Sequence, residues 1–466
     1  MISIILLSHI LNNLNIINGI IRRVYMILLG NGKLITRDGD NPFIEDGCLC
    51  VKDNLIYDLG TTKDMREKYP NEEFIDANQG LIMPGLINTH HHIYSSFARG
   101  LSLKGYNPKK FSDILEGMWW KIDKHLTLED VKYSAYVTYI DCIKNGVTTV
   151  FDHHASYGAT TGSLFEISGV AHELGLRTCL CYEVSDRNGK NEMIQAVKEN
   201  TNFINSTKQD TSDMQKGMMG LHAAFTLSDE TLYHIAENVP VDTGYHIHVA
   251  EGIEDLYDSL NKHNKRVVNR LYDMNILGPK TLAIHCIHIN PLEMDILKET
   301  NTMIVHNPES NMGNAVGCTP ILKIMDKDIV LGLGTDGYTS DMLESMKVAN
   351  ILHKHHNNNP SVAWAEVPKM LFDNNSEIAN RFYEKPLGIL KKGSYADVIV
   401  LDYDPFTPLD ENNVNSHILF GMNGRNVKTT MINGKLLMKD RKLLNIDEAS
   451  IFAKARELST DLWKKF

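Results

Sequence analysis

Eight short apolar runs recur along the middle of the chain, and segments with helical spacing separate them. Helical patterns such as LTLEDVKYSAYVTYIDCIKNG and SDETLYHIAENV lie between the runs. The runs are LIMPGLINTHHH, GVTTVFDHH, RTCLCYEVS, MMGLHAAFT, GYHIHVAEG, TLAIHCIHI, TMIVHNPES and IVLGLGTDG. Alternation of strands with helices is typical of parallel sheets covered by helices. We therefore expect an α/β fold, a (β/α)8 TIM barrel over residues 81–387.

The two ends of the chain have a different pattern, with short strands separated by turns. MILLGNGKLITRD and GCLCVKDNLIYDLG lie near the start, and YADVIVLDYDPF and VKTTMINGKLLMKDRKLL lie near the end. Asn433-Gly434 in the last of these is a strong hairpin signal. We expect a small β-sandwich domain built from residues 26–80 and 388–440. The remaining segment, 441–466, has helical spacing and is expected to form a C-terminal helix.

The first 25 residues form an apolar, Asn-rich leader. Their basic pair, Arg22 and Arg23, follows the apolar stretch, whereas a secretory signal has its charge first and a small-residue cleavage site afterwards. Asparagines interrupt the apolar run, which argues against a membrane span. The preferred interpretation is that translation starts at Met26. The alternative is a disordered or peripheral extension over 1–25.

Composition narrows the classes of function. The chain has 466 residues, a net charge of -11 and 43% hydrophobic residues, an ordinary balance for a soluble globular protein. The acidic balance argues against nucleic acid or an anionic membrane as a partner. Seven cysteines without a CxxC pair argue against a disulfide framework or a thiolate zinc site, so a cytoplasmic location is expected.

Nearly every apolar run ends in a residue able to do chemistry. The run ends carry His90, His91, His92, His153, His154, Glu183, His222, His246, His248, Glu251, His285, His288, His306 and Asp336. A strand places residues i and i+2 on one face, so His90 and His92 point together and His91 points away. The carboxyl ends of barrel strands converge at one mouth, where active sites of this architecture lie.

Each of these signals is weak by itself. A lone histidine pair is more often buried structure, and an Asp before Gly is more often a turn. His246 and His288 are expected to be structural or outward-facing. The tract His353, His355 and His356 is expected on a solvated helix surface. The coincidence of so many histidines and carboxylates at the strand ends favours a metal site over this structural alternative.

Histidine and carboxylate ligands without cysteine suit one divalent cation, with zinc first and iron or manganese as alternatives. Three histidines and one aspartate leave a position for water, whose pKa a zinc ion lowers to ~7. Glu251 lies three residues past His248, where it can shuttle a proton to a leaving group.

Five segments resemble, in order, signature motifs of the amidohydrolase superfamily. They are PGLINTHHH, HIHVAE, AIHCIHI, HNPESNM and LGLGTDG. The nearest branch is the chlorohydrolase and cytosine- or guanine-deaminase-like group. LIMPGLINTHHHIYSSFARGL and the C-terminal half look most like SsnA-type aminohydrolases. The resemblance runs from Met26 to about residue 440.

The resemblance implies a role for individual residues. His90, His92, His248 and Asp336 match the metal ligands, and Asp336 also matches a proton acceptor. Glu251 matches the proton-shuttling glutamate, and His285 matches the histidine beside the reacting water and the substrate. His222 matches a substrate-contacting histidine, although Phe225 stands where relatives have tyrosine.

Binuclear members carry a lysine at the end of strand four, and MMGLHAAFTLSD has none there, which implies a single metal. A substrate-binding or structural role is expected for Glu183, with bridging of a second metal as its alternative. Asn311 is expected to touch substrate or support the mouth. Trp119 and Trp120 either wall the pocket or belong to the core.

The function expected from these features is hydrolysis of a C–N bond in a cyclic, nitrogen-containing small molecule. Deamination is the first choice, and ring-opening hydrolysis of a cyclic amide is the alternative. The SsnA-like wording suggests a purine-derived heterocycle as substrate. A non-catalytic scaffold would be expected to lose metal ligands, and all four are present. The chain is also a candidate homo-oligomer.

Overall fold

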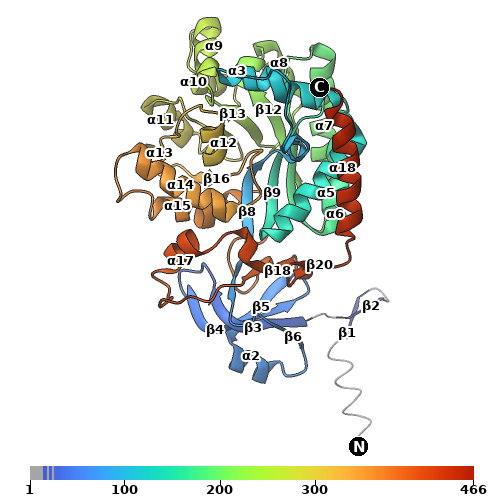
Figure 1. Ribbon diagram of the computed structural model, residues 1–466, viewed down its shortest axis with the longest axis vertical. Helices are drawn as coiled ribbons and strands as arrows, with labels where there is room; N and C mark the ends of the chain where they lie inside the picture. Colours follow the sequence, from blue (N-terminus) through green and yellow to red (C-terminus); the bar gives the residue numbers. More distant parts are fainter. Residues whose placement is uncertain (1–13, 18–19, 24–25) are drawn as a thin grey trace, which may run out of the picture.

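The computed structural model describes residues 14–17, 20–23 and 26–466. Two short strands, β1 (Leu14–Ile17) and β2 (Ile20–Arg23), pair antiparallel. The other residues of the leader lie outside the described ranges, and the start at Met26 stays a prediction. From Met26 onward, Figure 1 shows a large α/β part and a smaller β part joined end to end.

All eight apolar runs form parallel strands of the α/β part. Their bounds are β8 (Leu86–His91), β9 (Val147–His154), β10 (Arg177–Tyr182), β12 (Met219–Ala223), β13 (Tyr245–Val249), β14 (Leu282–His285), β15 (Met303–His306) and β16 (Leu331–Leu333). Every residue in these strands is buried, which explains why the runs are continuously apolar rather than alternating. The predicted mixed α/β architecture is confirmed.

The strands form two separate sheets, so the (β/α)8 barrel that we expected is not closed. One sheet has the order β11-β10-β9-β8, with β11 at Gln215–Gly217, and the other runs from β12 to β16. The two sheets meet at β11 and β12, which are neighbours in the sequence, since β11 pairs with β10 and β12 pairs with β13. A single bridge between Val184 and Leu221 completes this seam.

The opposite seam, between β8 and β16, has one bridge, His91 to Asp336, instead of a ladder. The side chain of Asn375 lies along this seam. Its Nδ2 donates to the carbonyls of Ile87 and Leu333 at 2.8 Å, and its Oδ1 accepts from the Leu333 amide at 2.8 Å. A buried amide thus satisfies backbone groups that a continuous ladder would otherwise pair.

Helices cover the outer faces of both sheets (Figure 1). The longer ones are α5 (Leu128–Lys144), α6 (Ser163–Leu174), α7 (Lys190–Thr207), α8 (Asp229–Asn238), α9 (Ile253–His263), α11 (Pro291–Glu299) and α14 (Met342–His356). Helices α5 and α11 begin with capping boxes, Thr127 with Asp130 and Asn290 with Glu293. No helix in the described part of the chain is long and apolar enough to cross a membrane.

The two ends of the chain combine in the smaller part, as predicted, but as one nine-stranded sheet. Its strands are β3 (Met26–Ile35), β4 (Phe43–Lys52), β5 (Leu55–Thr61), β6 (Glu73–Asp76), β7 (Leu81–Pro84), β17 (Val398–Leu401), β18 (Val427–Ile432), β19 (Lys435–Lys439) and β20 (Lys442–Leu443). Strand β7 pairs antiparallel with β17, which joins the two halves. The division into two stacked sheets that a β-sandwich requires is not confirmed. The predicted hairpin turn is found, with φ of 51° at Asn433 and 74° at Gly434.

The C-terminal segment forms helix α18 (Glu448–Trp463), which packs against α5. Near its end, Trp463 Nε1 donates to the Phe97 carbonyl at 2.7 Å. Phe97 lies in the 3-10 helix η1 (Ile93–Ala98), directly after His92. Helix α18 therefore contacts the segment that follows the first strand of the α/β part.

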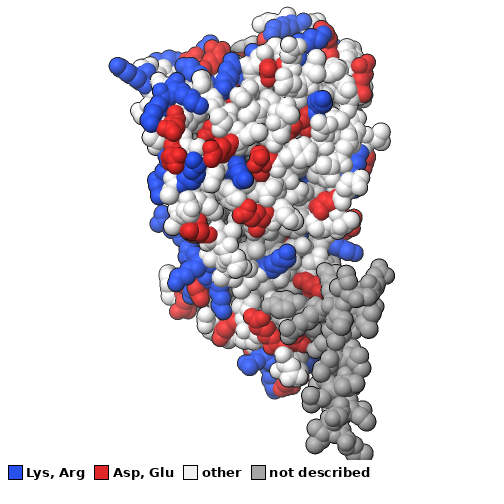
Figure 2. Space-filling model, turned by 90° about the vertical axis from the view of Figure 1, so that its right-hand side faces the viewer, with Lys and Arg blue, Asp and Glu red and all other residues white. Residues whose placement is uncertain are grey.

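On the face shown in Figure 2, Lys and Arg side chains are interspersed with Asp and Glu side chains.

Candidate metal centre

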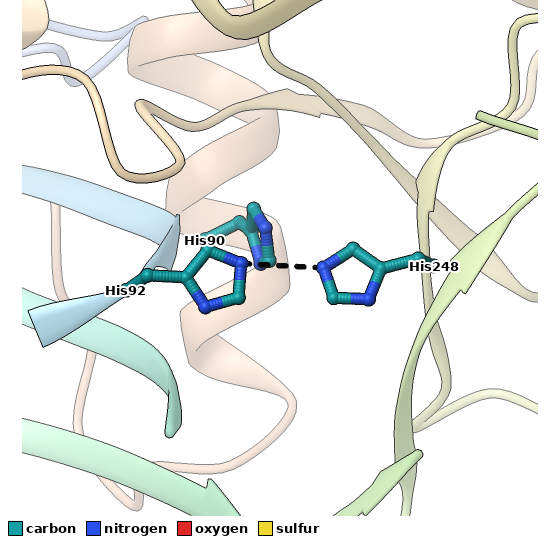
Figure 3. Close-up of side chains that lie close together, drawn as sticks. All are labelled: His90, His92 and His248. Atoms are coloured by element: carbon teal, nitrogen blue, oxygen red, sulfur yellow. Dashed lines mark hydrogen bonds between the residues drawn. The ribbon is translucent and has the colours of Figure 1, made fainter. Parts of the chain in front are cut away.

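Three histidines from two distant strands point at one another at the carboxyl end of the α/β part. His90 and His92 come from the end of β8, and His248 comes from β13 (Figure 3). The Nε2 atoms of His92 and His248 are 3.3 Å apart. Ligands of a tetrahedral zinc, each about 2.0–2.1 Å from the ion, lie roughly 3.3–3.4 Å from one another. His91 turns away and lies near Ser340, as strand alternation predicted.

A hydrogen bond at the far nitrogen orients each of these rings. His92 Nδ1 donates to the His153 carbonyl at 2.5 Å, and His248 Nδ1 donates to the His222 carbonyl at 2.9 Å. His90 Nδ1 lies 2.8 Å from His246 Nε2. Such bonds fix the tautomer and direct Nε2 toward a metal. His246 therefore faces inward, which corrects the outward-facing alternative, since it shares a strand face with His248.

The donor atoms fit a cation. Burial, followed by repulsion from neighbouring histidines, holds the pKa of His90 and of His248 well below the usual range, so both rings are neutral. His90 Nε2 and His285 Nε2 are buried without a hydrogen-bond partner among the described residues. Buried polar atoms rarely lack a partner, and two such atoms beside a carboxylate suit a divalent ion.

Asp336, just past β16, supplies that carboxylate. Its Oδ1 lies 3.4 Å from His92 Nε2, and its Oδ2 lies 4.0 Å from His90 Nε2 and 3.5 Å from His285 Nε2. Burial alone would raise the pKa of Asp336, but His92 and His285 outweigh it, so the pKa is lowered. The group is therefore ionised. His90, His92 and His248 form one cluster of ligand atoms, and His90, His285 and Asp336 form a second that overlaps it.

Glu251 and His285 stand together beside these ligands, with Glu251 Oε2 3.4 Å from His285 Nε2. Burial and then the charge of Asp336 raise the pKa of Glu251 well above its usual value, so this carboxyl tends to hold a proton. His285 Nδ1 donates to Asn311 Oδ1 at 2.7 Å. Its Nε2 therefore carries a lone pair and becomes a donor only when the ring is protonated.

Three of the four candidate ligands, His92, His248 and Asp336, line a cavity of about 520 Å³, its open mouth included, and His90 is buried behind them. Aromatic and apolar walls come from Tyr94, Phe111, Leu115, Trp119 and Trp120. Polar lining comes from His92, Ser95, Glu183, His222, His248, Glu251, Asn314 and Asp336. The pocket-wall alternative for Trp119 and Trp120 is thus the one observed. Asn311 is fully buried and does not line this cavity.

Glu183 lines the cavity, belongs to neither ligand cluster, and is held by an arginine that sequence reasoning missed. Arg187 Nη2 bonds to Glu183 Oε1 at 2.8 Å and also to Asp123. The guanidinium is stacked on Tyr157, 4.4 Å from the ring centroid. These contacts hold Arg187 in place, and the Glu183 carboxylate that it binds lines the cavity. Its position four residues after Glu183 in the loop following β10 was the available sequence signal.

His222 lies near the end of β12, the fourth apolar run along the chain. Its Nδ1 lies 2.8 Å from Thr226 Oγ1, and burial lowers its pKa to about 4, against the opposing charge of Glu183. The ring lines the cavity and contacts Trp120 at a centroid distance of 6.0 Å. His222 is thus a neutral group in a position to meet a ligand.

A further correction concerns the histidine tract on α14. His355 and His356 are exposed, as expected, but His353 is buried and lies 3.0 Å from His306, nitrogen to nitrogen. His353 faces the sheet because α14 packs that side of its surface against the strands.

Comparison with known proteins gives consistent matches over nearly the whole chain. The model for the Amidohydrolase family matches residues 81–437. A 5'-deoxyadenosine deaminase of Methanosarcina barkeri is 31% identical over 444 residues, covering 94% of this chain and 98% of the relative. A 5-methylthioadenosine/S-adenosylhomocysteine deaminase of Syntrophomonas wolfei is 29% identical, covering 94% and 99%.

Among solved structures, an adenosine deaminase from Xanthomonas campestris with bound zinc superposes with a TM-score of 0.83. It is 19% identical in sequence, and the match covers 94% of this chain and 99% of that one. At this identity the likeness shows the fold.

Proposed function

Because the chain belongs to the amidohydrolase family, as its motifs predicted, we propose that it is a metal-dependent aminohydrolase that removes ammonia from the adenine ring of a nucleoside. It is a hydrolase of carbon–nitrogen bonds. The observation that carries the proposal is the convergence of His90, His92, His248 and Asp336 with Glu251 on one aromatic-walled cavity. The deaminase names of the relatives favour deamination over ring opening of a cyclic amide.

The chain's own side chains divide the proton transfers between them. A divalent cation, when bound by the three histidines and Asp336, activates water for attack on the ring carbon that bears the amino group. Asp336 is ionised and accepts the proton that this water gives up. Glu251 holds a proton and delivers it to the ring nitrogen. The proton taken up by Asp336 passes to the departing amine, and the hydroxyl group on the ring carbon returns its proton to Glu251, so ammonia leaves and both carboxyls regain their starting states. His285, between the two carboxyls, stabilises developing negative charge once its ring is protonated.

The proposed cation is zinc, because three imidazoles and one carboxylate are a zinc-type ligand set and the Xanthomonas structure contains zinc. Iron and manganese suit the same ligands. A single ion is proposed, since MMGLHAAFTLSD, the fourth-strand segment in which binuclear members carry a lysine, has none. The narrower resemblance to SsnA-type proteins, the cytoplasmic location and the homo-oligomer stay predictions.

The walls of the cavity support a flat, neutral, purine-derived substrate. Trp119, Trp120, Tyr94 and Phe111 give surfaces on which a ring system packs. No lysine or arginine lines the cavity among the described residues. Glu183 faces the substrate as a hydrogen-bond acceptor, and we propose that it receives a donor group such as a sugar hydroxyl.

The test is release of ammonia by the zinc-loaded enzyme from 5'-deoxyadenosine, 5-methylthioadenosine, S-adenosylhomocysteine, adenosine and guanine, with cyclic amides in parallel. We expect ammonia and the corresponding deaminated product from at least one adenine nucleoside. Hydrolysis confined to the cyclic amides would replace this proposal with the ring-opening alternative.

A substitution at Glu183 is expected to separate binding from chemistry. Glu183→Gln should raise KM for the nucleoside by roughly tenfold, because hydrogen bonds to a charged acceptor contribute more than neutral ones. It should change kcat by less than about twofold, since Glu183 is not among the clustered ligands.

Asp123→Asn is the matched control for this substitution. Asp123 also pairs with Arg187 but is buried outside the cavity lining. Its KM should therefore stay close to that of the wild type. An equal rise of KM in both variants would mean that Glu183 acts only through Arg187.

A further inference from the structure

His285 stands on a strained stretch of backbone. It is the last residue of β14, and its φ is 70°, followed by a φ of 50° at Cys286. Residues other than glycine rarely adopt these left-handed values, and they persist only where surrounding groups hold them. The groups that hold His285 therefore determine where its Nε2 points.

Two buried side chains, Thr319 and Asn311, form hydrogen bonds to His285. Thr319 Oγ1 donates to the His285 carbonyl at 2.8 Å, and Asn311 Oδ1 accepts from the ring Nδ1 at 2.7 Å. Asn311 Nδ2 in turn donates to Thr319 Oγ1 at 3.2 Å. The Thr319 hydroxyl thus bonds both to the backbone carbonyl of His285 and to Asn311, the residue that orients the His285 ring.

The Thr319 hydroxyl also bonds to a chain of side chains made up of His306, His353 and Cys318. Thr319 uses its single proton on the His285 carbonyl, so His306 Nδ1, 3.1 Å away, must be the donor to Oγ1. His306 Nε2 then accepts from His353 Nε2 at 3.0 Å. His353 Nδ1 accepts from the Cys318 thiol at 3.6 Å. The Thr319 hydroxyl is therefore connected through buried histidines to helix α14.

We propose that Thr319 is a positioning residue of the reaction, which acts through His285. It lies outside the cavity lining and outside both ligand clusters. Its hydroxyl holds the strained carbonyl of His285 and orients the amide of Asn311, which together aim Nε2 at Glu251 and Asp336. This inference rests on the proposed function, because it assumes that His285 acts on the substrate.

Three variants of the full-length, zinc-loaded enzyme test the proposal. Thr319→Val removes the hydroxyl with little change of shape, and Thr319→Ser restores it. Thr281→Val is the matched control, because Thr281 is also buried, bonds a backbone carbonyl at 2.9 Å, and lies at the opposite end of β14. We expect Thr319→Val to lower kcat roughly 10- to 100-fold with KM nearly unchanged, as for small misplacements of a catalytic group. Thr319→Ser and Thr281→Val should stay within about threefold of the wild type.

A second readout does not depend on turnover. Backbone amide exchange over residues 285–289 should be faster in Thr319→Val than in Thr319→Ser or Thr281→Val, while metal content stays the same. Thr319→Ala replaces the valine variant if the latter does not fold.

The possible results separate this inference from the proposed function. Equal kcat values for Thr319→Val and Thr281→Val in an active deaminase would overturn the positioning role alone. A wild type that deaminates nothing would overturn the proposed function, and amide exchange would still decide whether Thr319 holds His285. Loss of activity in Thr319→Ser as severe as in Thr319→Val would also contradict a role for the hydroxyl.

Discussion

Glu251→Gln is expected to lower kcat by roughly 10²- to 10⁴-fold, the range that a positioned general acid or base contributes. The reason is that Gln cannot give up a proton to the substrate as the protonated Glu251 carboxyl does. The metal content should not change, because Glu251 belongs to neither cluster of ligand atoms. Initial rates of ammonia release, with elemental analysis of the same preparations, measure both quantities.

Glu309→Gln is the matched control for this substitution. Burial raises the pKa of Glu309 to about 7, and its carboxylate accepts a hydrogen bond from Ser345 at 2.9 Å. It is thus another largely buried carboxyl with a raised pKa, but it does not line the cavity. Its variant should keep nearly full activity. Undiminished turnover in Glu251→Gln would remove Glu251 from the mechanism.

Removal of the metal is expected to have the second large effect. Chelation should lower activity by at least about a thousandfold, because activation of water by a cation is worth several kcal/mol of barrier. About one equivalent of zinc per chain should restore it. Metal analysis during the titration tests the stoichiometry, and a requirement for two equivalents would contradict the single-ion site.

His248→Ala is the genetic counterpart of chelation. It should lose both the bound metal and the activity, since His248 is one of the three clustered imidazoles. His288→Ala is the control, because the His288 ring donates from Nε2 to the Val316 carbonyl at 3.0 Å and lies outside the cavity. Retention of a full equivalent of zinc in His248→Ala would show that the ion binds elsewhere.

The strands and the position of the ligands could be predicted from sequence because both follow from short periods. Continuous apolar runs identified the buried strands, and a period of two selected His90 and His92 over His91. The same period applied to GYHIHVAEG places His246 beside His248, and the outward alternative for His246 was wrong for that reason.

The remaining site residues lie beyond what such periods can indicate. Arg187 and Thr319 lie in irregular segments, where direction depends on the local backbone rather than on a repeat. His353 belongs to a polar-looking helix end whose inner face becomes clear only when α14 is packed on the sheet. The seam at Asn375 was equally hidden, because a buried asparagine on a helix gives no sign that it replaces strand pairing.

The sheet shared by β7 and β17 has a consequence for how the protein is made. A ribosome adding roughly 5–20 residues per second emits β3–β7 long before their partners exist. Asn54, for example, bonds to Asn433, which lies 379 positions later. Leu81 of β7 pairs with Leu401 of β17, so for about 15–65 seconds the edge of β7 would be open to foreign strands, as any unpaired edge is. We therefore expect nascent chains to need chaperone protection until the last strands emerge, and C-terminal nonsense alleles to aggregate rather than yield an active barrel fragment.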